Sequence, residues 1–132
     1  MYPTRKQIMK VEQTFKPETI KMIKNWKKIE WSINKNFESL EILAKVLASI
    51  YEKPVKIEYA PDTPSCYYNS VNKTIFINNS TSIISLLHEF AHHLFGHSEL
   101  KACRWSVWLF KKTFPTSFAK LKWKGHLLCK TI

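Results

Sequence analysis

Two histidines and a glutamate in the middle of the chain have the spacing of a zinc-binding helix. His88, Glu89 and His92 form the pattern H-E-x-x-H within a mostly apolar stretch from Ser82 to His97. Four residues of an α-helix advance about 6 Å and leave a rotation of only about 40°, so the two imidazoles would lie one turn apart on the same face. This spacing predicts that His88 and His92 bind one zinc ion together.

Glu89 lies about 100° further round the same helix and is expected to be the catalytic base of a hydrolytic reaction. A bound zinc ion lowers the pKa of its water toward about 7, and Glu89 would accept the water proton during attack on a carbonyl. The alternative is that both histidines are ordinary residues of an amphipathic helix. The surrounding isoleucines, leucines and phenylalanines argue against it, because buried polar side chains require partners or a metal.

A catalytic zinc site requires a third protein ligand besides the two histidines. The candidates with suitable donor atoms are His93, His97, Glu99 and the more distant His126. His93 would point about 100° away from the preceding histidine and is a poor ligand. Gly96 suits a helix end and Ser98 suits the cap of a following helix, so a turn between two helices would return Glu99 toward the first. Glu99 is therefore the preferred third ligand, and His97 is the second choice.

The segment after this turn resembles the second helix of the ImmA/IrrE-like metallopeptidases. That family has roughly the pattern E-x-x-A-N/D-x-F-A, which is similar to Glu99-Leu-Lys-Ala102-Cys103-Arg-Trp105-Ser106 in this chain. The segment 72–78 also looks like the family's strand before the zinc helix, and the whole resemblance covers about residues 55–112. The chain departs from the pattern at Cys103, which stands where the family has Asn or Asp, often the partner of a ligating histidine.

The resemblance implies a zinc metallopeptidase of the gluzincin type, with Glu99 as the third ligand. It also implies an intracellular regulatory role, in which the enzyme cuts a repressor or a partner protein of a mobile element. Two further departures are the short gap between His92 and Glu99 and the late position of Pro115 after the second helix.

We predict that residues 1–132 form one domain of the α+β class with a zincin-like fold. Helices are expected in the basic N-terminal segment 1–35 and from Asn36 to about Tyr51. A small three-stranded antiparallel sheet should follow, with strands at 55–59, 65–68 and 74–78. The H-E-x-x-H helix and the second ligand-bearing helix come next. The basic-aromatic C-terminal segment 116–132 is expected to form a short helix over the edge of the core.

An edge of this sheet is expected beside the metal, where an extended peptide substrate could add as a further strand. Either 65–68 or 74–78 would supply that edge. The residues that could stabilise the oxyanion of the reaction are Tyr67, Tyr68 and His126, and ordinary packing is the alternative for each.

The net charge of +11 is unevenly distributed along the chain. Residues 1–53 carry +5, residues 54–100 carry −2 and residues 101–132 carry +8, so the excess lies outside the predicted metal site. All but two of the 21 cations are lysines, whereas specific recognition of bases favours arginine. A solvated lysine-rich surface is the simpler interpretation, and weak electrostatic binding of nucleic acid is the alternative.

The three cysteines, Cys66, Cys103 and Cys129, form no C-x-x-C pair, and their odd number argues against a disulfide framework. The first residues contain no apolar signal stretch, and no apolar run is long enough to cross a membrane. We therefore expect free thiols and a cytoplasmic protein without membrane contact. The sequence leaves the oligomeric state open.

The expected function is that of a zinc-dependent endopeptidase acting on a regulatory or partner protein. The alternatives are a basic nucleic-acid-associated protein with a structural or vestigial zinc site, and a DNA-linked protease of the SprT-like type. An inactive descendant that acts through protein contact is a further alternative. All of these interpretations share the predicted metal site and differ in what Glu89 and the basic segments do.

Overall fold

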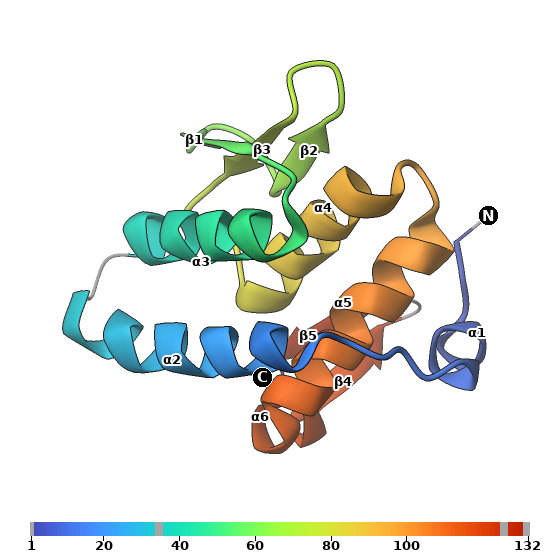
Figure 1. The fold of residues 1–132 in the computed structure, drawn as a ribbon. Helices are drawn as coiled ribbons and strands as arrows, with labels where there is room; N and C mark the ends of the chain where they lie inside the picture. Colours follow the sequence, from blue (N-terminus) through green and yellow to red (C-terminus); the bar gives the residue numbers. More distant parts are fainter. Residues whose placement is uncertain (1, 34–35, 125–126, 131–132) are drawn as a thin grey trace.

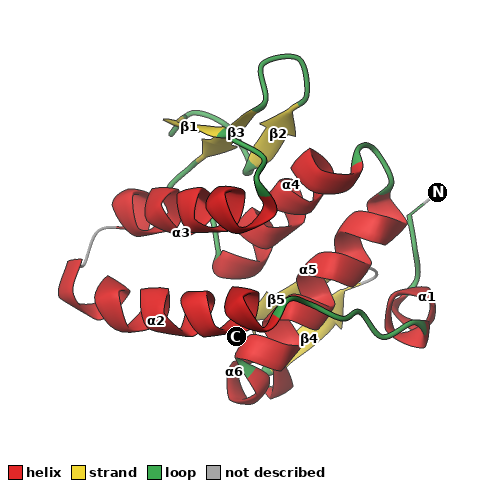
Figure 2. Ribbon diagram, in the orientation of Figure 1, coloured by secondary structure: helices red, strands yellow, loops and turns green. Residues whose placement is uncertain are grey.

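The computed structural model describes residues 2–33, 36–124 and 127–130. The helices are α1 (Arg5–Lys10), α2 (Pro17–Ile33), α3 (Asn36–Tyr51), α4 (Ile83–Phe95), α5 (Glu99–Thr113) and α6 (Pro115–Ala119). The strands are β1 (Lys56–Tyr59), β2 (Tyr67–Asn69), β3 (Thr74–Ile77), β4 (Leu121–Lys124) and β5 (Leu127–Lys130). The class is therefore mixed α and β, and Figure 2 shows helices between two small, separate sheets.

The long N-terminal helices form where the apolar spacing predicts them. Pro17 occupies the first position of α2, where the missing N–H costs no hydrogen bond, and Ile23 and Trp26 are buried one turn apart. The indole Nε1–H of Trp26 donates to the carbonyl of Ser39 at 2.6 Å, which joins α2 to α3. The N-terminal segment also contains α1, a separate short helix capped by Thr4. Figure 1 shows α1 far from α2 in space, beside α5.

The sheet of β1, β3 and β2 is mixed, and our prediction of an antiparallel sheet was wrong for one of its two pairings. β3 lies in the centre, parallel to β1 and antiparallel to β2. The chain leaves β1, reverses into β2 and returns through a tight turn as β3, so β1 and β3 point the same way. Alternating apolar residues predict a strand without specifying the direction of its neighbour, which depends on long-range pairing.

This strand order also decides between the two candidates for the edge near the metal site. β3 is paired on both sides, whereas β2 lies at an edge and contacts α4. Residues 67–69 therefore form the edge, and 74–78 do not.

The C-terminal segment contains only a short helix, α6, and then changes to the antiparallel pair β4 and β5. The prediction of a helix was wrong for this second part. Leu121 and Trp123 alternate with Lys122 and Lys124, which is the period of a strand. The expectation of a short helix for the whole segment overlooked this change of period.

Two apolar clusters hold these elements together. The main core contains side chains of α2, α3, α4, α5 and the three-stranded sheet, and Leu43, Leu87 and Phe90 are fully buried in it. A second cluster centres on Ile8, Cys103 and Val107, against which Phe118 and Trp123 pack, so it joins both ends of the chain to α5. No helix in the described ranges is both long and apolar enough to cross a membrane.

Candidate metal centre

The turn between α4 and α5 brings the predicted ligands together. Ser82 caps α4, and Gly96 ends it with a φ of +82°, which favours glycine. The N–H of Gly96 donates to the carbonyl of His92 at 2.9 Å. Ser98 then caps α5 by accepting from the N–H of Lys101 at 3.2 Å. The predicted turn is confirmed, and it places Glu99 at the first position of a helix that packs back on α4.

One carboxylate oxygen of Glu99 lies between both histidines of the motif. Its Oε1 is 2.7 Å from Nε2 of His92 and 3.0 Å from Nε2 of His88. The three residues offer ligand atoms within 4.8 Å of one another and could hold a metal ion. His97 is exposed and is not part of this group, while His126 lies outside the described residues.

The remaining ring nitrogen of each histidine has a partner that favours metal binding. Nδ1 of His92 lies 2.7 Å from the carbonyl oxygen of Gly96, and since a carbonyl only accepts, Nδ1 carries the proton. The Nε2 of a neutral His92 therefore directs a lone pair at Glu99. Two acceptors at such a distance require a proton or a cation between them. The donor set thus fits a cation on chemical grounds.

Cys103 contacts both His88 and Glu99 from the next turn of α5. Its Sγ lies 3.8 Å from Nδ1 of His88 and 3.9 Å from Oε2 of Glu99. Burial, followed by the charge of Glu99, raises the pKa of this thiol to about 12, so it keeps its proton. The thiol can accept from Nδ1–H of His88 and donate to Glu99, while Nε2 of His88 faces Oε1 of Glu99.

The two carboxylates of the site have pKa values shifted in opposite directions. Burial raises the pKa of Glu89 to about 7, although the charge of His92 and a backbone hydrogen bond partly counteract it. Burial acts the same way on Glu99, but when no metal is bound the positive charge of protonated His88 and hydrogen bonds from both protonated histidines outweigh it and lower the pKa of Glu99. Glu99 is therefore an anion that could bind a metal, while the carboxylate of Glu89 can exchange a proton near neutral pH.

Glu89 also links α4 to the edge strand. Its Oε1 accepts a hydrogen bond from the backbone N–H of Tyr68 in β2 at 2.9 Å. Because the N–H and C=O of one strand residue face the same side, the carbonyl of Tyr68 points to this edge as well. Glu89 thus lies between the candidate ligand group and the strand edge. The sequence carried no signal for this contact, since it involves the backbone.

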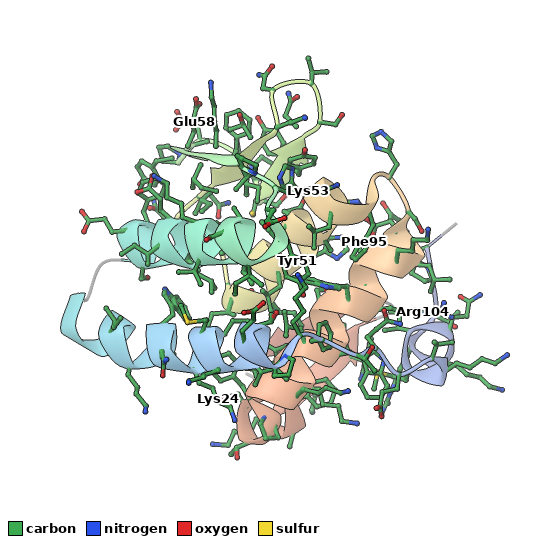
Figure 3. The ribbon with its side chains drawn as sticks, viewed as in Figure 1. Lys24, Tyr51, Lys53, Glu58, Phe95 and Arg104 are labelled. Carbon is green, nitrogen blue, oxygen red and sulfur yellow. The ribbon has the colours of Figure 1, made fainter. Side chains whose placement is uncertain are left out.

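The candidates for oxyanion stabilisation have different surroundings. The hydroxyl of Tyr68 lies 2.8 Å from Nδ1 of His93, whose Nε2 is 3.0 Å from the carbonyl of Lys53. The carbonyl of Lys53 accepts from Nε2–H of His93, so Nδ1 of His93 accepts from the Tyr68 hydroxyl. These hydrogen bonds fasten β2 to α4, and Figure 3 labels Lys53 near the end of α4. Tyr67, on the other face of β2, stacks on Phe76 with ring centres 4.7 Å apart. The sequence interpretation missed the role of His93.

Comparisons of the chain with protein-family models, with curated proteins and with solved structures find no match. The chemical interpretation of the site therefore depends on its own geometry. That geometry combines a three-residue donor group, a carboxylate with a raised pKa and a strand edge within hydrogen-bonding reach of that carboxylate.

Proposed function

We propose that this protein is a zinc-dependent endopeptidase of the gluzincin type. The observation that carries the proposal is the convergence of His88, His92 and Glu99, with Glu89 directed at the edge of β2. Two imidazole nitrogens and one carboxylate oxygen are a donor set found in catalytic zinc sites, which keep one position for water. The family resemblance of this segment supports the same assignment.

Zinc bound to these residues would act as a Lewis acid and lower the pKa of water. Glu89 would take a proton from that water and later give it to the leaving amine nitrogen. The Tyr68 N–H occupies Oε1 of Glu89, which leaves Oε2 for the proton. Burial favours this role because it brings the affinity of the carboxylate for a proton close to neutral pH.

The substrate would be an extended peptide that pairs with β2. A strand added to this edge could donate an N–H to the outward carbonyl of Tyr68, the residue whose own N–H binds Glu89. The exposed ring of Tyr67 and its partner Phe76 lie on the other face of the sheet and would not obstruct this approach. The resemblance suggests that the natural substrate is a regulatory protein in the cytoplasm.

The direct test of the proposal is cleavage of an unfolded protein such as reduced, alkylated casein. We expect new peptides by mass spectrometry when the protein is loaded with zinc, loss of cleavage with a chelator, and recovery when zinc is restored. The metal supplies most of the acidification of water, so the apoprotein should be at least about 100-fold slower. Cleavage that persists unchanged after the metal is removed would contradict the proposal.

Removal of the Cys103 thiol should weaken zinc binding without unfolding the protein. Partners of ligating groups typically contribute 10–100-fold in metal affinity, and Cys103→Ala removes a contact to two of the three proposed ligands. Competition with a chromophoric chelator would measure the affinity. Cys103→Ser, which keeps a donor and an acceptor, should recover most of it. The matched control is Cys66→Ala, which removes another buried thiol, and an equal effect of both alanine variants would refute the role.

A further inference from the structure

The whole net charge of the protein resides in its two ends. Residues 1–10 and 101–132 together contain eleven Lys and Arg residues and no Asp or Glu. Residues 11–100 contain ten lysines and all ten acidic residues, so the middle of the chain is neutral. Segments that are about a hundred residues apart in sequence therefore share one electrostatic character.

The fold brings these two ends into contact. The guanidinium of Arg104 in α5 donates to the carbonyl of Gln7 in α1 through Nε at 3.1 Å and Nη2 at 2.9 Å. The indole of Trp108 donates to the carbonyl of Ile8 at 3.1 Å. Figure 3 shows Arg104 on the side of α5 that faces α1. The N-terminal cations are thus fixed beside those of α5.

Strand β4 and helix α6 extend the same surface. The guanidinium of Arg5 lies 5.5 Å from the ring centre of Trp123, and the ammonium of Lys111 lies 4.9 Å from Trp108 and 5.6 Å from Phe118. We call the surface of residues 5–10, 101–113 and 115–123 the basic face, because these segments pack together; the cations on their described side chains are Arg5, Lys6, Lys10, Lys101, Arg104, Lys111, Lys112, Lys120 and Lys122.

The cations of α5 point in a similar direction. At 100° per residue, Lys101, Arg104, Lys111 and Lys112 fall within about 100° of the helix circumference, over a length of about 16 Å. Two glutamates close to these cations have interaction partners. Glu99 contacts the histidines, and Glu12 pairs with Lys112 at 3.2 Å. Glu12 thus partly neutralises Lys112, and the positive charge of this helix face comes mainly from Lys101, Arg104 and Lys111.

We infer that the basic face binds the phosphate backbone of nucleic acid without sequence preference. Regularly spaced phosphates match a row of cations, and binding releases their condensed counterions. Most of the cations are lysines, which bind phosphates as point charges, and the rings of Trp123 and Phe118 have cations over them, so stacking on bases is disfavoured. The apolar side chains of these elements are buried or half-buried, which argues against insertion into a membrane.

The test uses the full-length protein and a 20-base-pair DNA duplex of random sequence. We expect a dissociation constant in the micromolar range at low salt, and an affinity that falls steeply as salt rises. The variant Lys6→Gln, Lys10→Gln, Lys122→Gln removes three exposed charges of the basic face. It should bind at least tenfold more weakly, and the slope of log affinity against log salt should shrink by up to about 2.7.

The matched control is Lys28→Gln, Lys45→Gln, Lys56→Gln, which removes three exposed lysines from α2, α3 and β1. Both variants have the same net charge, so a bulk charge effect would weaken them equally, whereas we expect the control to stay within about threefold of the unmodified protein. Equal weakening of the two variants would overturn the inference. So would tighter binding to polyglutamate, or to vesicles containing phosphatidylserine, than to the duplex. Zinc content, measured in parallel, reports on the metal site independently of this surface.

Discussion

Glu99→Ala should lower the zinc affinity on the order of 10³-fold and leave the purified protein nearly free of metal. Zinc sites in small proteins are worth about 10–16 kcal/mol in total, so one ligand accounts for several kcal/mol. In this chain Glu99 is also the anionic member of the group and contacts Nε2 of both histidines. Its loss would leave two neutral imidazoles, which bind a divalent cation weakly. Metal analysis after dialysis and chelator competition would measure the change.

The control for this experiment is Glu58→Ala, which removes an exposed carboxylate from β1 and should leave zinc content unchanged. Normal zinc content in Glu99→Ala would show that another residue completes the site. His97, which is exposed in the turn between α4 and α5, would then be the first candidate, and Glu99→Ala combined with His97→Ala would decide the matter.

Glu89→Gln should abolish peptide hydrolysis while the protein keeps its zinc. The amide cannot accept a proton from water, and loss of a general base typically costs 10²–10⁴-fold in rate. The amide oxygen can still accept the hydrogen bond from the Tyr68 N–H, so the position of β2 should not change. The measurement is the rate of casein cleavage at equal zinc loading. Loss of zinc in this variant would mean that Glu89 is itself a ligand.

The same variant carries a stability prediction for the zinc-free protein. Burial raises the pKa of Glu89 to about 7, so the folded state holds this proton more tightly than the unfolded state does. The stabilising contribution is complete below the ordinary pKa near 4.5 and is lost as the pH rises from there to about 7. Glutamine has no charge to bury. The melting temperature of Glu89→Gln, relative to that of the unmodified protein, should therefore increase between pH 5 and pH 8.

The local elements of the site could be predicted from the sequence because they depend on neighbours within one or two turns. The spacing of His88 and His92 places both on one helix face, and Gly96 and Ser98 end one helix and begin the next. With these two signals, the return of Glu99 to the histidines was a geometric expectation. The structure confirms that the three residues meet. The antiparallel pairing of β2 with β3 also agrees with the sheet that the sequence predicts, because the two strands are close neighbours along the chain.

Only the tertiary structure decided the features that depend on contacts between distant segments. The parallel pairing of β1 with β3, and hence the choice of β2 as the edge, results from the path of the whole sheet. The Tyr68 N–H reaches Glu89 because that edge packs on α4. Likewise, α1 packs against α5 through the cluster around Ile8, and this packing gathers the charge of both chain ends on one face. Residue patterns specify local geometry, whereas the free energy of burying apolar surface selects which elements become neighbours.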